Sequence, residues 1–181
     1  WQDGEVTDLG TLGGKESAAI DINGAGQIVG HADTADGNLR AVLWQDGEIT
    51  DLGTLGGHNS AAVAINEVGQ IVGHAHTADD VFHAVLWQDG QIADLGTLGG
   101  GESGAKDINN VGQIVGEAQT TDSSKHAVLW QDGQIIDLGT LGADISRAEG
   151  INDAGQIVGV VTIVEASSYL TRGVLWQEAD N

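Results

Sequence analysis

A repeat of 43 residues dominates this chain and constrains its fold more than any other feature. The hexapeptide Asp-Leu-Gly-Thr-Leu-Gly begins at Asp8, Asp51, Asp94 and Asp137. The tetrapeptide Gln-Ile-Val-Gly has the same spacing and begins at Gln27, Gln70, Gln113 and Gln156. Self-similarity at such a period is the signature of a solenoid or a propeller, in which each repeat is one supersecondary unit. We therefore expect four copies of one small unit in the 181 residues.

Each repeat has the pattern of four short antiparallel strands. In the first repeat, residues 17–23 alternate in polarity, and the turn sequence Asn-Gly-Ala-Gly leads into a second strand at 27–32. A polar loop at 33–38 precedes a third strand at 40–45, and Asp46-Gly47 predicts a tight hairpin into a fourth strand at 48–52. No segment has the period of 3.6 residues that an amphipathic helix requires, so we expect almost no helix.

Four hairpin-linked strands per repeat match the blade of a β-propeller. The sequence predicts an all-β fold, a four-bladed β-propeller with four-stranded repeats at about 17–52, 60–95, 103–138 and 146–177. The small residues at one shared position, for example Gly30, fit the crowded axis of such a ring. The tryptophan that closes each repeat would fill the wider space between blades.

The two ends of the chain carry complementary parts of a repeat. Residues 1–12 repeat the end of a third strand, its hairpin and a fourth strand, whereas no fourth strand follows Trp176. We expect the N-terminal strand, with Trp1, Val6, Asp8 and Leu9, to complete the last blade as a Velcro closure. The alternative is that this strand pairs with the last blade of a neighbouring molecule and builds a filament. Closure within the chain is favoured because a tethered strand has the higher effective concentration.

The last repeat is three residues longer than the others. The tryptophans at its end and at the ends of the earlier repeats are Trp44, Trp87, Trp130 and Trp176, so only the final interval is stretched. The extra residues fall between Val160 and Arg172. We expect them to lengthen the loop between the second and third strands and to leave the unit intact.

Charge and composition exclude several classes of partner and cofactor. The chain has 27 Asp and Glu against 6 Lys and Arg, a net charge of −21, which would repel nucleic acid and anionic membrane surfaces. With no cysteine, disulfides and Cys-ligated zinc are excluded. The longest apolar stretch is too short to span a bilayer. We expect no cofactor, although calcium could bind so acidic a surface.

Four residues are candidates for a metal site. His74 and His76 are two apart on one predicted strand and therefore share a face, a spacing that can ligate a metal. His31 and Glu117 occupy the same repeat position as His74 and would join it if that position faced an axial channel. The simpler interpretation, which we favour, is that these side chains lie on solvated strands and bind no metal.

No motif for catalysis is present, and the carboxylates are scattered, so we do not expect an enzyme. The loop between the second and third strands differs most between repeats and is the expected partner surface. Phe82 and Tyr169, both in this loop, are the only aromatic residues besides the tryptophans. The favoured function is a non-catalytic interaction scaffold with a protein or glycan partner. The alternatives are a self-assembling structural protein that forms filaments and, last, an enzyme.

The repeat also resembles a known family. The combination of Asp-Leu-Gly-Thr-Leu-Gly-Gly, Ile-Asn-x-x-Gly-Gln-Ile-Val-Gly and x-Ala-Val-Leu-Trp is similar to the HAF repeat of bacterial extracellular proteins and covers all four units. His83-Ala84-Val85 and His126-Ala127-Val128 stand where that family has His-Ala-Phe. The resemblance implies secretion or display on the surface of a bacterium or archaeon.

Overall fold

The computed structural model describes residues 4–166 and 168–177, and these residues form strands and turns without a helix. The strands build four antiparallel sheets that follow one another along the chain. The first sheet consists of β1 (Gly13–Ile22), β2 (Ile28–Thr34), β3 (Leu39–Gln45) and β4 (Glu48–Asp51). The second consists of β5 (Gly56–Ile65), β6 (Ile71–Thr77), β7 (Phe82–Gln88) and β8 (Gln91–Asp94). The third consists of β9 (Gly99–Ile108), β10 (Ile114–Thr120), β11 (Lys125–Gln131) and β12 (Gln134–Asp137). The fourth consists of β13 (Ile145–Ile151), β14 (Ile157–Glu165) and β15 (Ser168–Trp176).

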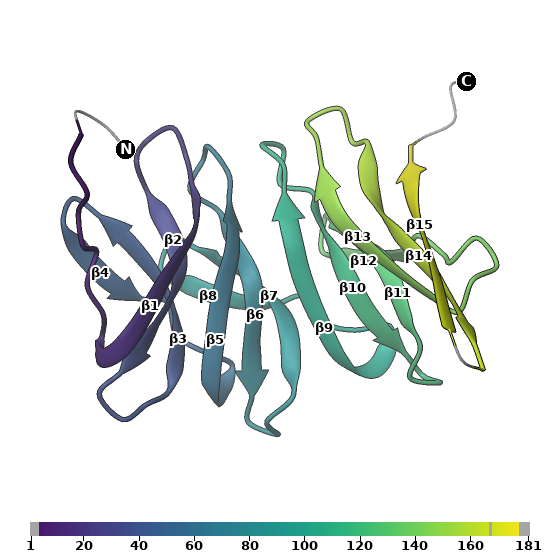
Figure 1. Ribbon diagram of the computed structural model, residues 1–181, viewed down its shortest axis with the longest axis horizontal. Coiled ribbons are helices and arrows are strands. Elements are labelled where there is room, and N and C mark those ends of the chain that lie inside the picture. The colour runs from purple at the N-terminus through teal and green to yellow at the C-terminus, as the bar shows by residue number, and fades with distance from the viewer. Residues whose placement is uncertain (1–3, 167, 178–181) are drawn as a thin grey trace.

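Within every sheet, the strands lie side by side in chain order. The sheets themselves form a row along the long axis of the molecule, with the first sheet at one end and the fourth at the other (Figure 1). Each sheet packs against the next one along the chain. The prediction of an all-β fold made of four sequential repeats is thereby confirmed.

The predicted hairpin turns form because their residues accept positive φ. Asp46 and Gly47 have φ values of 55° and 82°, as the two central residues of a type I′ turn require. The same Asp-Gly pair has positive φ in the second and third sheets. The turn between the first and second strands is held by a side chain, since Asn23 Oδ1 accepts the backbone N–H groups of Ala25 and Gln27.

A β-bulge explains the glycine that recurs in the second strand of each sheet. In the first sheet Ala19 pairs with Gly30 and Asp21 pairs with Val29, so Ile20 is the extra residue. A Cβ atom at Gly30 would collide with the carbonyl oxygen of Ala18. The glycine is therefore required by crowding across the bulge of its own sheet. The sequence had led us to expect crowding at the axis of a ring instead.

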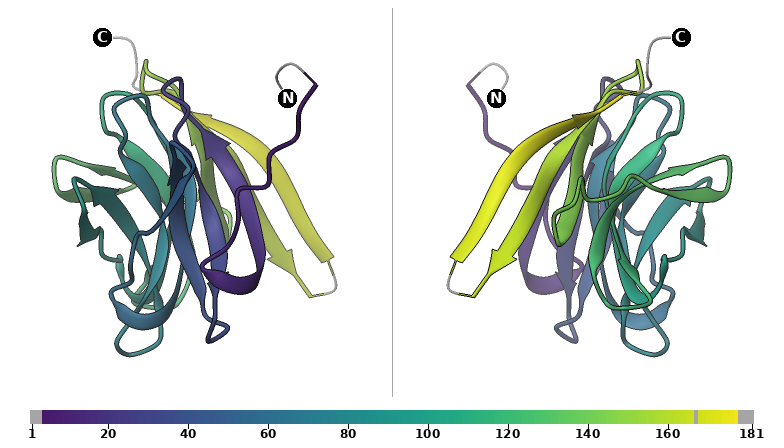
Figure 2. Two further views of the ribbon diagram at one scale, coloured as in Figure 1. Left: turned by 90° about the vertical axis from the view of Figure 1, so that its left-hand side faces the viewer. Right: turned by 90° about the vertical axis from the view of Figure 1, so that its right-hand side faces the viewer.

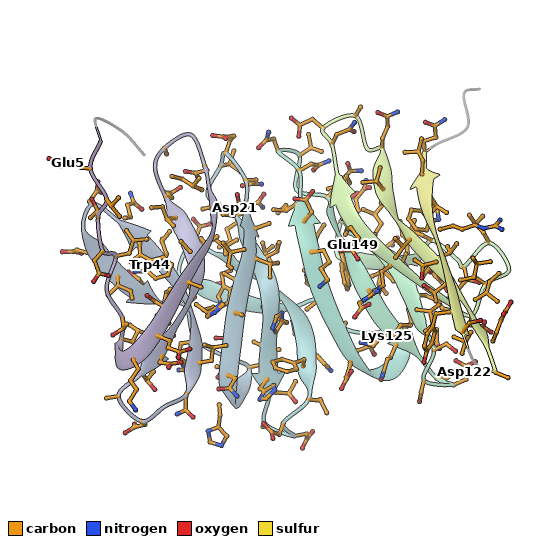
Figure 3. The ribbon with its side chains drawn as sticks, in the orientation of Figure 1. Glu5, Asp21, Trp44, Asp122, Lys125 and Glu149 are labelled. Atoms are coloured by element: carbon orange, nitrogen blue, oxygen red, sulfur yellow. The ribbon has the colours of Figure 1, made fainter. Side chains whose placement is uncertain are left out.

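The core repeats between successive sheets. Ile65 and Trp87 of the second sheet share one apolar cluster with Val29 of the first, and Leu52 and Leu55 of the connecting segment pack against it. Trp130 of the third sheet lies in the corresponding cluster of the next interface. Figure 3 shows Trp44 within the first sheet. The second linker likewise supplies Leu95 and Leu98, whereas the third supplies Leu138 and leaves Leu141 exposed. The recurring Asp-Leu-Gly-Thr-Leu-Gly sequence therefore contributes apolar side chains to the stacking of the sheets.

Hydrogen bonds also join the sheets at the repeat spacing. Ser60 Oγ, fully buried, accepts the N–H of Ala41 at 2.9 Å and donates to the carbonyl oxygen of Gly53 at 2.8 Å. Ser103 and Ser146 make the equivalent pairs of bonds at the next two interfaces. Near the opposite end of the strands, an asparagine ladder runs through all four sheets, in which the Nδ2 of each of the first three asparagines donates to the backbone oxygen of the next. Its members are Asn23, Asn66, Asn109 and Asn152.

The fourth sheet departs from the sequence prediction. β14 and β15 have nine residues each, against seven in the corresponding strands of the other sheets. The three extra residues therefore extend the hairpin as paired strand instead of lengthening a loop. The cause is their β-forming composition, because Ile163 pairs with Leu170 and Val164 with Tyr169.

The predicted completion of the fourth sheet by the N-terminal strand is not seen in the described residues. β15 pairs with β14 alone, and Val6 is 91% exposed. Leu9 packs instead with Trp44 of the first sheet. Trp1 lies outside the described residues. Figure 2 shows the molecule from its two ends, with the N-terminal segment beside the first sheet and β15 at the other end.

Candidate functional site

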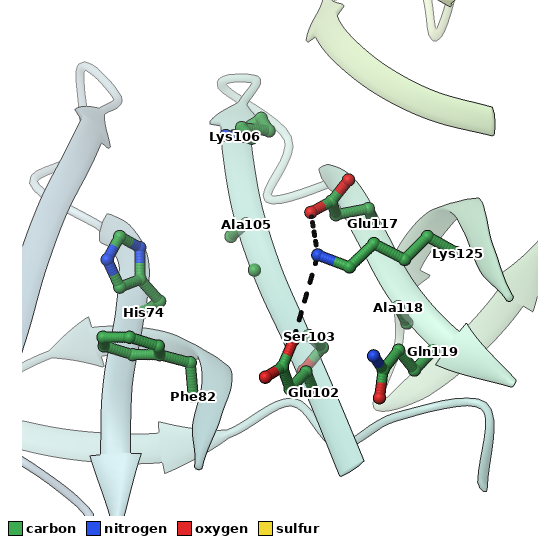
Figure 4. Close-up of a pocket in the computed structure, with 11 residues that line it drawn as sticks. His74, Phe82, Glu102, Ser103, Ala105, Lys106, Glu117, Ala118, Gln119 and Lys125 are labelled. Atoms are coloured by element: carbon green, nitrogen blue, oxygen red, sulfur yellow. Dashed lines mark hydrogen bonds and ion pairs between the residues drawn. The ribbon is translucent and has the colours of Figure 1, made fainter. Parts of the chain in front are cut away.

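A pocket of about 180 Å³ lies between the second and third sheets (Figure 4). Two aromatic side chains from the second sheet form one wall, and charged and amide side chains from the third sheet form the other. The residues that carry its chemistry are His74, Phe82, Glu102, Lys106, Glu117, Gln119 and Lys125.

The aromatic wall is built on two neighbouring strands. Phe82 is the first residue of β7 and is paired in register with His76, near the end of β6. The Phe82 ring meets the His74 ring edge-on, with centroids 4.9 Å apart at 89°, and the His76 ring at 3.8 Å and 49°. His76 Nδ1 in turn lies 2.8 Å from Asp80 Oδ1. Phe82 is therefore fixed between two imidazoles, since side chains two residues apart on β6 point to the same face.

The charged wall is an ion-pair network. Lys125 Nζ donates to Glu117 Oε1 at 2.9 Å and lies 3.9 Å from Glu102 Oε2. Arg147, from the fourth sheet, brings its Nε to 3.7 Å from Glu117 Oε2. Lys106 also lines the pocket, so Lys106, Lys125 and Arg147 gather here in a chain with only 6 Lys and Arg. The partly buried Glu117 carboxylate therefore has a cationic nitrogen within 4 Å of each of its two oxygens.

The pKa of His74 is strongly shifted from its ordinary value. Burial lowers its pKa from 6.5 to about 4, and the positive charges of Lys106, His76 and His31 act in the same direction. At neutral pH His74 is therefore uncharged. Its ring can pack against a ligand or exchange a single hydrogen bond, but it does not add positive charge to the pocket.

The structure brings together part of the set that the sequence singled out. His74, Phe82 and Glu117 line the same pocket, and His76 contacts Phe82. His31 lies on the first sheet and does not line the pocket. Within residues 4–166 and 168–177, no group of three or more His, Asp or Glu side chains has an arrangement that could hold a metal ion. The hypothetical ligand set of His31, His74 and Glu117 is therefore not assembled.

The other aromatic candidate lies elsewhere. Tyr169 is in β15, not in a loop, and is 77% exposed at the far end of the row of sheets. It does not line the pocket. Phe82 is the first residue of β7 and Tyr169 is the second residue of β15. Both therefore lie at the start of the third strand of their repeats, but they belong to different surfaces.

Sequence reasoning did not identify Lys125 and Glu102 as site residues. The available signal was the comparison of repeats, because Leu39 and Phe82 hold the position that Lys125 holds in the third repeat. Similarly, Glu117 replaces the histidines His31 and His74. The third repeat therefore has charged residues, Glu117 and Lys125, at two positions where the first two repeats have other side chains. Because the third sheet stacks on the second, these two residues line a pocket opposite Phe82.

A second hollow, of about 1000 Å³, runs along the edge between the third and fourth sheets. Its apolar lining comes from β11, β12, β14 and β15 and comprises Leu129, Ile136, Ile157 and Trp176. In the second and third sheets, the fourth strand lies beside the third strand at this place. We call this hollow the edge groove.

No protein-family model matches the chain. A search of curated proteins also finds no match. The resemblance to the HAF repeat family therefore stays a prediction. Among the described residues there is no helix long and apolar enough to cross a membrane.

Proposed function

We propose that the chain is a non-catalytic interaction scaffold and that the pocket between the second and third sheets is its ligand site. The observation that carries the proposal is that this pocket combines side chains that do not recur at the equivalent positions of the other repeats. Phe82 faces the Lys125–Glu117 pair across it, whereas the repeat positions of these residues hold other side chains in the other sheets. A regular scaffold that places one distinct set of side chains in a hollow is typical of a binding site.

The chemistry of the two walls favours a neutral sugar unit of a glycan. One face of a sugar ring is lined by C–H groups that pack on an aromatic ring such as Phe82. Its hydroxyl groups can donate to the Glu102 carboxylate and accept from Lys125 or the Gln119 amide. The pocket is small enough for a single ring, and the net charge of −21 opposes the approach of a polyanion.

A non-catalytic role is supported by the pairing of the carboxylates. Glycoside hydrolysis uses two carboxyl groups, one of which must hold a proton as general acid. Glu117 Oε1 accepts a hydrogen bond from Lys125 Nζ, its Oε2 lies 3.7 Å from Arg147 Nε, and Glu102 Oε2 lies 3.9 Å from the same Lys125 ammonium group. This arrangement suits hydrogen bonding to a ligand better than proton transfer.

The test is binding of the chain to an array of neutral and acidic glycans. Phe82→Ala is expected to weaken binding about tenfold or more, because an aromatic platform contributes at least about 1.4 kcal/mol. Tyr169→Ala is the matched control, since it removes an exposed aromatic residue outside the pocket. Binding that depends on Tyr169 and not on Phe82 would refute the assignment of the pocket, and capture of a protein in place of a glycan would refute the ligand class.

We also propose that each sheet corresponds to one blade of a propeller, and we propose a location for the protein. The first strands of successive sheets contact one another, as inner strands do around a propeller axis, and this supports the blade assignment. The four-bladed ring closed by residues 1–12 stays a prediction. Secretion or surface display in a bacterium or archaeon is supported by the HAF resemblance and is tested by locating the protein in cell fractions.

A further inference from the structure

Among the described residues, no sheet packs on the outer face of the fourth sheet, whereas the corresponding faces of the other three sheets are covered. Val29, Val72 and Val115 occupy one repeat position and are fully buried by the following sheet, but Val158 at the same position is 53% exposed. At the other end of the row, the first sheet also has an exposed face. Ile65 and Ile108 are 7% and 6% exposed against the preceding sheet, but the equivalent Ile22 is 61% exposed.

These two exposed faces are complementary halves of one interface. Val29 shares a cluster with Ile65, Val72 with Ile108, and Val115 with Ile151. Val158 of the fourth sheet and Ile22 of the first sheet hold these same two repeat positions. The internal interfaces show what covers each face, namely the first strand of a repeat against the face of the repeat before it.

The edge groove provides a place for the strand that the fourth sheet lacks. β3 pairs with β4 so that Trp44 lies opposite Ile49 and Val42 opposite Asp51. Applied to β15, this register places Val6 opposite Trp176 and Asp8 opposite Val174. Trp176 lines the edge groove, and Val6 is almost fully exposed.

The segment that would enter the groove already has the required local structure. Asp51 Oδ1 accepts the N–H of Gly53 at 2.8 Å, which shapes the turn after the fourth strand. Asp8 Oδ1 accepts the N–H of Gly10 at 2.9 Å in the same way. The turn that follows the docking segment is therefore already formed, which lowers the entropic cost of association.

A charge pair adds specificity. In each complete sheet, a basic residue of the third strand pairs with the aspartate at the end of the fourth, at 2.8–3.0 Å. The three pairs are Arg40–Asp51, His83–Asp94 and His126–Asp137. Arg172 and Asp8 hold the same two positions in β15 and in the N-terminal segment. They are oppositely charged and lie at opposite ends of the molecule.

We propose that a second copy of this chain occupies the outer face of the fourth sheet. Its residues 5–8 add a fourth strand to β15 in the edge groove, and its β1 covers Val158 with Ile22. A second copy is the occupant because the first and fourth sheets lie at opposite ends of the long axis (Figure 1). The contact is head-to-tail, so it leaves a free face at each end and can propagate.

The first test is the molar mass of the chain over a range of concentrations. The weight-average mass is expected to rise about twofold or more above 18.5 kDa as concentration increases, as mass action requires. Asp8→Arg and Arg172→Asp should each keep the chain at the monomer mass, because each places like charges in contact. An equimolar mixture of the two variants should assemble again, because both contacts between the variants then join opposite charges. Val68→Asp, in an exposed turn away from both end faces, is the matched control and should assemble like the unchanged chain.

The second test reads the register and distinguishes a second copy from the chain's own N-terminus. The chain has no cysteine, and Leu43 opposite Thr50 predicts Leu175 opposite Thr7. A Thr7→Cys chain mixed with a Leu175→Cys chain should give a disulfide-linked dimer, whereas Thr7→Cys mixed with Tyr169→Cys should not. A chain carrying both Thr7→Cys and Leu175→Cys should form linked oligomers. A disulfide within the single chain, or a mass of 18.5 kDa at every concentration, would overturn the proposal.

Discussion

Ser60→Ala tests whether the buried serines hold the sheets together. The Ser60 hydroxyl accepts from Ala41 N–H and donates to Gly53 O, and its residue is fully buried. Removing it leaves two backbone groups without a partner at the interface of the first two sheets. Each unpaired buried group costs about 1–3 kcal/mol, so the expected loss in the free energy of unfolding is about 2–6 kcal/mol. That is a large part of the total stability of a domain, about 5–15 kcal/mol.

Ser17→Ala is the matched control, because Ser17 has the same repeat position but is exposed at the start of the row. The assay is urea unfolding in dilute solution, followed by tryptophan fluorescence. With a slope of about 2 kcal/mol per molar urea, a loss of about 3 kcal/mol lowers the midpoint by about 1.5 M. Ser17→Ala should shift the midpoint by less than about 0.3 M, as for a surface substitution within about 0.5 kcal/mol. Equal shifts for the two variants would refute the reasoning.

Two further predictions concern the bulge and the pocket. Gly73→Ala should destabilise the chain by about 3 kcal/mol in the same urea assay, because its Cβ would collide with the Ala61 carbonyl; Gly104→Ala, which meets no atom within 4 Å, should be neutral or stabilising by about 0.5 kcal/mol. Burial lowers the folded-state pKa of His74 to about 4, so between pH 6.5 and 4 the unfolded chain takes up a proton that the folded chain does not. As the pH is lowered from 6.5 to 4, the free energy of unfolding should therefore decrease by about 3 kcal/mol more in the unchanged chain than in His74→Gln. An NMR titration of His74 with a midpoint near 6.5 would contradict the second prediction.

The strands and turns could be predicted because their determinants are local. Asp46-Gly47 fixes a type I′ turn from two residues, and alternation assigns a strand from a few more. The bulge at Ile20 was not predicted, because it depends on which residue of β1 faces Gly30 across the sheet. The extension of the last hairpin could not be predicted from the local sequence either. The same extra residues could form a loop or paired strand, and the pairing of Ile163 with Leu170 decided for strand.

The candidate site was predicted only in part, for a similar reason. His74 and Phe82 stand on adjacent strands of one repeat, so their proximity follows from the hairpin. Glu117 and Lys125 belong to the next repeat, and their place opposite Phe82 depends on how two sheets stack. The assignment of Phe82 and Tyr169 to loops was wrong, since Phe82 begins β7 and Tyr169 lies in β15.

The sequence by itself determined the repeated unit, namely its length, its strand order, its hairpins and the number of its copies in the chain. These features depend on turn residues, alternation and a period, all of which are readable along the chain. Only the tertiary structure decided that the sheets form a row, that one interface holds a distinctive pocket, and that Val158 and Ile22 lie at opposite exposed ends. The physical reason is that identical units can stack in a row or close into a ring with the same local sequence. The difference lies in the geometry between sheets, which no single repeat encodes.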